Sequence, residues 1–202
     1  MAEQKESELL VALDEYIGAR VHIGTNIKTK DAGKFIYRVN PDGLCVLNVS
    51  EIDKRIRMVA KFLASYSPED VAVFGGREQA KKALGAFSKY TGIRVFAGRY
   101  PVGLMTNPEG KNYFEPRIVL VVDPYLDKNP VHDAYLSGIA VFALFDSNNL
   151  LRNVDFAIPC NNKGANAVGV VFYLIAREYL RARGELPKDK DLPIKEFKAD
   201  VL

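Results

Sequence analysis

Two hydrophobic patterns alternate along most of the chain. Short, continuously apolar runs of strand length are separated by longer segments whose apolar residues recur at helical spacing. The apolar runs occupy residues 44–49, 71–74, 93–96, 117–122, 139–144 and 156–158. Strands that are apolar without alternation are typical of a parallel sheet buried on both faces.

The segments between these runs predict helices, the first of which we expect Ser50 to cap. The longest helix is predicted from about Gly164. Its apolar face consists of Val168, Val171, Phe172, Ile175 and Tyr179. A short helix is also expected near 131–137, and a helical turn at 31–38. Strands alternating with helices predict an α/β fold: a doubly wound parallel sheet with helices on both faces, flavodoxin-like or Rossmann-like.

One domain accounts for most of the 202 residues. We expect residues 1–184 to form a single α/β domain with an N-terminal extension, and residues 185–202 to form a polar tail that stays flexible until it docks. Proline and glycine mark a turn at Pro41-Asp42-Gly43. Residues 98–116 contain three prolines and three glycines and predict a long functional loop.

Composition narrows the class of protein. The chain is 48% hydrophobic and 26% charged, with a net charge of +3, which is typical of a globular protein and only mildly basic. No apolar run reaches the roughly 18–20 residues needed to span a bilayer, and no signal peptide is evident, so a cytoplasmic location is expected. Cys45 and Cys160 lack CxxC spacing and predict reduced thiols. His22 and His132 are the only histidines, which makes a histidine metal site unexpected.

Such sheets bind ligands where their strands end, so reactive groups are expected at those positions. Gly75-Gly76 follows a strand but belongs to neither GxGxxG nor a P-loop, which favours a tight turn over a phosphate site. Asp123 and Asp146 also follow strands and either form a carboxylate pair or stabilise local turns. His22 is either a proton shuttle or a structural imidazole. No nucleophile lies in a recognisable context, so the sequence predicts no enzyme, cofactor, metal or small-molecule substrate.

Anion binding has more support than catalysis. The turn Asn161-Asn162-Lys163-Gly164 opens the longest helix, where N–H groups and the helix dipole favour phosphate, although the asparagines alternatively cap the helix. Tyr100 and Phe114 either stack on bases or pin the long loop to its domain. The remaining candidates for phosphate contacts are His22, Lys28, Lys30, Lys34, Arg38 and Arg99.

Five segments in this order resemble a known family. They are VHIGT (21–25), KFIYRVNPDGLCVLNV (34–49), RYPVGLMTNP (99–108), GIAVFALFDSNN (138–149) and FAIPCNNKGANAVGVVFYLIAREYL (156–180). This set resembles the small-subunit ribosomal protein S-two family, which includes the eukaryotic laminin-receptor (SA) ribosomal protein, over about residues 8–182. Only residues 108–116 stand where bacterial members insert a long helical hairpin, and the tail lacks the long acidic extension of animal members. The chain is therefore most similar to the archaeal type.

The resemblance implies a structural constituent of the small ribosomal subunit, with small-subunit rRNA and neighbouring ribosomal proteins as partners and no catalysis. With this resemblance, the residues named above as candidates for anion or base contacts become candidate rRNA contacts. Two alternatives remain open: a flavodoxin-like small-molecule phosphate or nucleotide binder or enzyme, and a scaffold that binds proteins through its termini.

Overall fold

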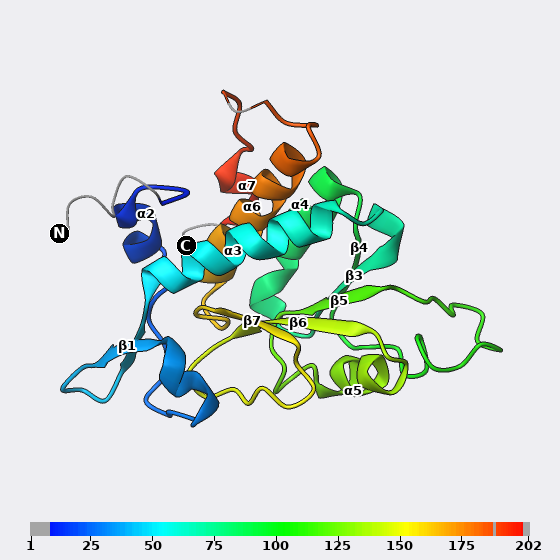
Figure 1. Cartoon of the computed structure of the whole chain (residues 1–202), viewed down its shortest axis with the longest axis horizontal. Coiled ribbons are helices and arrows are strands. Elements are labelled where there is room, and N and C mark those ends of the chain that lie inside the picture. The colour runs from blue at the N-terminus through cyan, green and yellow to red at the C-terminus, as the bar shows by residue number, and fades with distance from the viewer. Residues whose placement is uncertain (1–8, 188, 200–202) are drawn as a thin grey trace.

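A five-stranded parallel sheet forms the centre of the computed structural model, which describes residues 9–187 and 189–199 (Figure 1). Its strands are β3 (Val71–Gly75), β4 (Arg94–Ala97), β5 (Ile118–Val121), β6 (Ala140–Phe145) and β7 (Phe156–Pro159). Their spatial order is β4-β3-β5-β6-β7, and every neighbouring pair is parallel. This is the flavodoxin-like strand order 2-1-3-4-5, which confirms the predicted fold class.

Helices cover the two faces of the sheet unequally. One face carries α3 (Val49–Ala64), α4 (Lys81–Thr91) and α6 (Ala165–Ala182), whereas the other carries α5 (Lys128–Leu136) and the long loop (Figure 1). Thirteen of the 18 residues of α6 are buried, because α6 lies between the sheet, α3 and α4. A helix that is apolar on most of its circumference is stable only in such a position.

The N-terminal third differs from the prediction. Residues 44–49 do not join the parallel sheet: β2 (Cys45–Leu47) pairs antiparallel with β1 (Ile36–Val39) in a separate two-stranded sheet. The predicted helical turn is correct only for the 3-10 helix Asp31–Phe35. Strand β1 was missed because most of its residues are exposed, so no apolar run or alternation marks it.

The turn predicted at 41–43 closes this hairpin. Gly43 has a φ of 84° and its N–H donates to the carbonyl of Asn40 at 2.9 Å. A positive φ at this position suits glycine, which has no Cβ to clash. The next helix, α3, is capped by Asn48 and not by Ser50, because Asn48 Oδ1 accepts the N–H of Ser50 at 3.0 Å.

Two buried polar side chains fix the start of the described chain to the helical layer. The guanidinium of Arg177, on α6, donates to the carbonyl of Leu10 at 2.7 Å. The hydroxyl of Tyr16, in α2 (Leu13–Gly18), donates to Asp53 of α3 at 2.8 Å. Burial and the carboxylate of Asp53 raise the pKa of Tyr16, so this hydroxyl keeps its proton and remains a donor.

Residues assigned to a flexible tail pack on their own domain. In α7 (Ile194–Phe197), the ring of Phe197 is buried, with its centroid 5.8 Å from that of Tyr90 on α4 and 5.8 Å from that of Tyr173 on α6. Leu192 is buried beside them. The described tail therefore docks on α4 and α6, whereas the division of the chain at residue 184 stays a prediction. Residues 1–8, part of the predicted N-terminal extension, lie outside the described residues.

Gly169 of α6 lies directly under this tail, and a Cβ at that position would meet the carbonyl oxygen of Phe197 at 2.4 Å. We expect Gly169→Ala to lift α7 from α6 and to lower the free energy of unfolding by about 1–3 kcal/mol in urea denaturation. Gly85→Ala is the matched control, because a Cβ at this exposed position of α4 would meet nothing within 4 Å. The control variant should be unchanged or stabilised by about 0.5–1 kcal/mol. Equal losses in both variants would contradict tight docking of the tail.

Candidate functional site

The carboxyl edge of the sheet is the position where this strand order binds ligands, at the switch point between β3 and β5. Here the polar groups at that position bond to one another, and a hollow of about 290 Å³ remains beside Gly76 and Asp127. The guanidinium of Arg77, after β3, pairs with the carboxylate of Asp123, after β5. The N–H of Gly76 donates to Asp127 Oδ1 at 2.8 Å, and a Cβ on Gly76 would lie 2.7 Å from that oxygen. Glycine is therefore required by close packing, as the tight-turn interpretation predicts.

The same network continues along the edge to β6 and β7. The amide of Asn149 donates to Asp123 Oδ1 at 2.9 Å, and the amide of Asn162 donates to Asn149 Oδ1 at 3.0 Å. The ammonium of Lys163 pairs with the buried carboxylate of Asp146 at 2.5 Å. A charge that is removed from water needs such a partner.

The alternatives for the two aspartates can now be compared. Asp123 Oδ1 accepts the N–H of Tyr125 at 3.0 Å, and Asp146 Oδ1 accepts the N–H of Ser147 at 2.6 Å. Both carboxylates thus stabilise their own turns, and each is also neutralised by a basic side chain. Within the described residues, no group of three or more His, Cys, Asp or Glu side chains could hold a metal ion.

The N-terminal segment crosses this edge and is bonded to it. Thr25 N–H donates to Ser147 Oγ at 2.8 Å, and Thr29 Oγ1 donates to the carbonyl of Asn149 at 2.8 Å. Gly24 passes so close that a Cβ would lie 2.9 Å from Ser147 Oγ. Residues 20–40, which we call the basic arm, are therefore held against the sheet by contacts that are distant in sequence.

The turn at 161–164 supports the capping interpretation. Asn161 Oδ1 accepts the N–H groups of Lys163 and Gly164, each at 3.0 Å. These are the donors that a phosphate would use at this end of α6. Asn162 is fully buried, and the ammonium of Lys163 also donates to Asn148 Oδ1 at 2.8 Å. The structure thus gives all three predicted residues partners within their own domain.

The predicted basic residues are distributed differently. Lys28, Lys30, Lys34 and Arg38 are exposed on the basic arm. Arg99 is also exposed but follows β4, at the opposite end of the strand order from β7, so the structure does not bring it to the arm. None of these five side chains makes an ion pair with another described residue.

His22 lies within the arm but is half-buried. Its Nδ1 is buried without a hydrogen-bond partner among the described residues, and burial lowers the pKa of the ring. The imidazole is therefore neutral near pH 7, which fits the structural alternative better than a proton shuttle.

The two aromatic residues proposed for the long loop pin it to the domain. Tyr100 is buried, its ring meets Phe74 edge-on at 5.3 Å, and its hydroxyl donates to Asp133 at 2.8 Å. The half-buried ring of Phe114 packs under the guanidinium of Arg94, at 4.2 Å from the ring centroid.

An aromatic residue that the sequence analysis missed is better exposed. Tyr37 in β1 is 72% exposed and lies between Lys34 and Arg38 along the arm. The sequence KFIYR (34–38) combines basic and aromatic residues, a pattern typical of RNA-binding surfaces. A helical turn was predicted there instead, so Tyr37 was not recognised as exposed.

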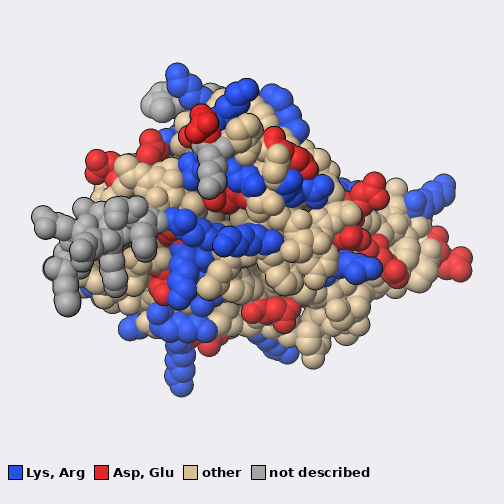
Figure 2. Space-filling model, turned by 45° about the horizontal axis from the view of Figure 1, so that its top comes forward, with Lys and Arg blue, Asp and Glu red and all other residues tan. Residues whose placement is uncertain are grey.

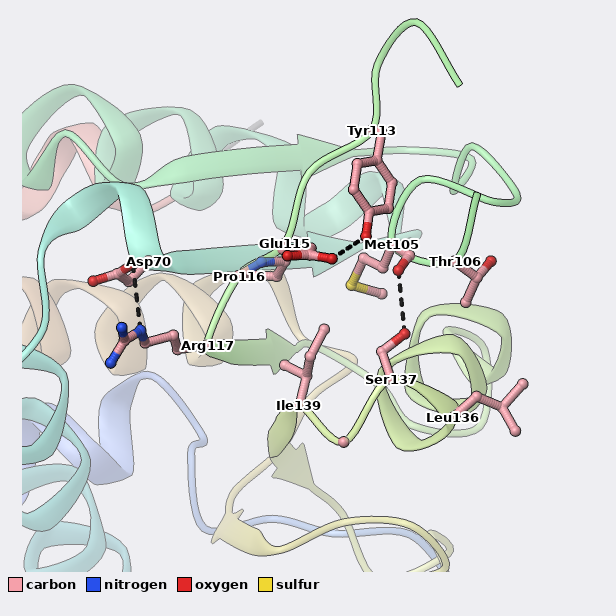
Figure 3. Close-up of a pocket in the computed structure, with 11 residues that line it drawn as sticks. Asp70, Met105, Thr106, Tyr113, Glu115, Pro116, Arg117, Leu136, Ser137 and Ile139 are labelled. Atoms are coloured by element: carbon pink, nitrogen blue, oxygen red, sulfur yellow. Dashed lines mark hydrogen bonds and ion pairs between the residues drawn. The ribbon is translucent and has the colours of Figure 1, made fainter. Parts of the chain in front are cut away.

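A hollow of about 950 Å³ opens at the other edge of the sheet, between the long loop and the end of α5 (Figure 3). Its polar side chains bond to one another: Tyr113 to Glu115, and Arg117 to Asp70 at 3.8 Å. The hydroxyl of Ser137 donates to a loop carbonyl at 3.1 Å, with no base bonded to it. This arrangement offers no activated nucleophile.

The chain is similar in sequence to known proteins of one family. Residues 110–182 match the family model described as Ribosomal protein S2. A small ribosomal subunit protein uS2 of Nanoarchaeum equitans is 41% identical over 196 residues, covering 96% of this chain and 98% of the relative. Proteins of the same name from Korarchaeum cryptofilum and Staphylothermus marinus are 43% and 45% identical, covering 94% and 92% of this chain and 87% and 84% of those relatives.

A flavodoxin-like sheet whose polar groups at the ligand edge bond to one another, together with an exposed basic arm, is typical of an α/β protein with a structural role. The chain belongs to the ribosomal protein S2 family, as the similarity over nearly its whole length shows. That family consists of structural ribosomal proteins and not of enzymes. Among the described residues, no helix is both long and apolar enough to cross a bilayer.

We expect Lys163→Ala to destabilise the fold, because it leaves the carboxylate of Asp146, which is 1% exposed, without its cation. Removing one partner of a buried pair costs several kcal/mol, and since Lys163 is one-third exposed the loss should be about 2–3 kcal/mol. Lys28→Ala is the control and should change the free energy of unfolding by less than about 0.5 kcal/mol. Equal stability of both variants in thermal or urea unfolding would show that the pair is not structural.

Burial raises the pKa of Asp127 to about 6. The folded state thus binds this proton more tightly than the unfolded chain, and the resulting stability is present at low pH and lost as pH rises through about 6. Asp127→Asn keeps an oxygen for the N–H of Gly76 and removes this titration. Between about pH 4 and pH 7, the variant should therefore gain up to about 3 kcal/mol relative to the unmodified protein. Parallel pH profiles of unfolding in the two proteins would contradict the raised pKa.

Proposed function

We propose that this protein is a structural constituent of the small ribosomal subunit, in the cytoplasm, and that its basic arm contacts small-subunit rRNA. The relatives that cover nearly the whole chain are named small ribosomal subunit proteins. Membership in a non-enzymatic family supports a binding role over catalysis. Neighbouring ribosomal proteins are the second class of partner in this proposal.

The charge distribution carries the rRNA part of the proposal. Residues 20–40 contain five Lys or Arg and one Asp, a net charge of +4, whereas the whole chain has +3, so the remainder has −1. Asp31, the single acidic residue of the arm, accepts the N–H of Leu151 at 2.9 Å. Local positive charge of this kind binds phosphates even in a protein that is nearly neutral overall.

The arm also offers a group that can contact a base. Figure 2 shows Lys and Arg side chains left of centre and also along the top of the molecule, with Asp and Glu between them. Tyr37 adds an exposed ring within the arm on which a base can stack. The proposed contacts are Lys28, Lys30, Lys34, Arg38 and Tyr37.

Arg99 is kept in the proposal as a separate contact beyond β4. Lys163, Asn161, Asn162, His22 and Tyr100 are assigned to holding the surface in place, because their polar groups or rings are engaged or buried. The small-molecule alternative has less support, because Arg77 and Asp127 are bonded to Asp123 and to the N–H of Gly76 at the switch point. The hollow that remains there, of about 290 Å³, is at the small end of the range for ligand sites.

Replacing Lys28, Lys30 and Lys34 together by Gln should weaken binding to small-subunit rRNA and flatten its salt dependence. Each phosphate contact contributes roughly 0.7–0.9 to the log–log salt slope, so loss of three contacts should lower the slope by about 2–3. The slope is measured by filter binding over a series of KCl concentrations.

A triple Gln variant at the exposed Lys54, Lys61 and Lys195 is the matched control, because it removes the same charge outside the arm. It should change the slope much less. Equal changes of the slope in both variants would show that only the net charge of the protein matters. An unchanged slope in the arm variant would show that these lysines do not contact rRNA.

A further inference from the structure

The face of the sheet opposite α6 carries unusually exposed apolar side chains. Tyr125 is 76% exposed, Leu126 is 50% exposed and Leu150 is 61% exposed. They come from the β5–α5 and β6–β7 connections, which adjoin at the carboxyl edge because β5 and β6 are neighbours in the sheet. Clustered exposed apolar residues mark interaction surfaces more often than isolated ones do.

These side chains line a groove of about 880 Å³, which we call the α5 groove. Its walls are the first half of α5 and the two connections, and most of its surface is apolar. The residues around it are Thr29, Pro124, Tyr125, Leu126, Lys128, Asn129, Val131, His132, Asn148, Leu150, Arg152 and Asn153. This volume accommodates several side chains of a bound segment.

The charges around the groove are of one sign. Lys128 and Arg152 line it, and no Asp or Glu is found among the described residues that do so. Asp123, Asp146 and Asp155, which are close in sequence to lining residues, bond to Arg77, to Lys163 and to the N–H of Val141. Three further carboxylates near the groove in sequence also have partners elsewhere. Asp31 accepts a hydrogen bond from the N–H of Leu151, and Asp127 accepts one from the N–H of Gly76. Asp133 accepts a hydrogen bond from the hydroxyl of Tyr100. An occupant therefore meets an apolar floor with positive charge at its rim.

We propose that the α5 groove binds a segment of a neighbouring protein that inserts apolar side chains and pairs Asp or Glu with Lys128 and Arg152. This inference rests on the proposed function, which places the neighbouring protein in the small ribosomal subunit. Nucleic acid is a poorer occupant, because burying Leu126 and Leu150 requires apolar groups that a phosphate backbone does not offer. Asn129, Asn148 and Asn153 supply polar groups for the backbone of the bound segment.

The test places a photo-crosslinking benzoylphenylalanine at Leu150 in the full-length chain, expressed in its native host and isolated with small subunits on sucrose gradients. We expect crosslinks to a protein segment whose sequence, determined by mass spectrometry, contains apolar residues and at least one Asp or Glu. The same probe at Met58, which is 46% exposed on α3, is the matched control and should not label that segment. Crosslinks from Leu150 to rRNA, to a basic segment or to nothing in assembled subunits would overturn the groove assignment.

A second experiment tests the charges by reversing them. Lys128→Glu combined with Arg152→Glu should reduce the yield of the crosslink from Leu150 at least several-fold, whereas Lys54→Glu with Lys61→Glu should not. Circular dichroism of the purified variants verifies that each is folded. Absence of the unmodified protein from small subunits would overturn the proposed function and this inference together. Normal incorporation without the predicted crosslink would overturn the groove alone.

Discussion

The ion pair between Arg77 and Asp123 is the constraint on which the rest of the site depends. It joins the ends of β3 and β5, where the strand order of this sheet would otherwise leave a crevice. Asn149 continues the bonding to the next strand, and Asp127 holds the N–H of Gly76. Because these polar groups bond to one another, they are not free to bind a soluble ligand. A position that often serves catalysis in this fold is here used to join neighbouring strands.

The hydrogen bonds at this edge also hold the basic arm in place. Ser147 and Asn149 belong to the closing network and at the same time bind Thr25 and Thr29 of the basic arm. The arm is thus anchored on its inner side, while its lysines project outward. A positively charged segment that is already ordered loses less conformational entropy when it binds phosphates than a flexible tail would. Anchoring therefore favours phosphate binding by this arm even though the chain as a whole is nearly neutral.

The sequence predicted the sheet well and the N-terminal hairpin poorly, for one physical reason. Buried parallel strands are apolar along their whole length, so their pattern is visible without a structure. Exposed β1 carries no such pattern, and it pairs with β2 in a hairpin separate from the parallel sheet. The partners of the candidate site residues could not be predicted from the sequence either. Lys163 and Tyr100 have suitable chemistry for RNA, but only the fold reveals that Asp146 and Asp133 already bind them.

The two proposed surfaces differ in chemistry but share a boundary. Thr29 belongs to the basic arm and also lines the α5 groove, and its hydroxyl is bonded to the connection that carries Leu150. A protein segment in the groove would therefore rest against the root of the arm, and its acidic groups would meet Lys128 and Arg152 instead of competing for the arm lysines. Such an occupant would cover apolar surface that RNA leaves exposed and would restrict the arm further. Protein and RNA contacts at this edge are then expected to stabilise each other, because each orders a segment that the other uses.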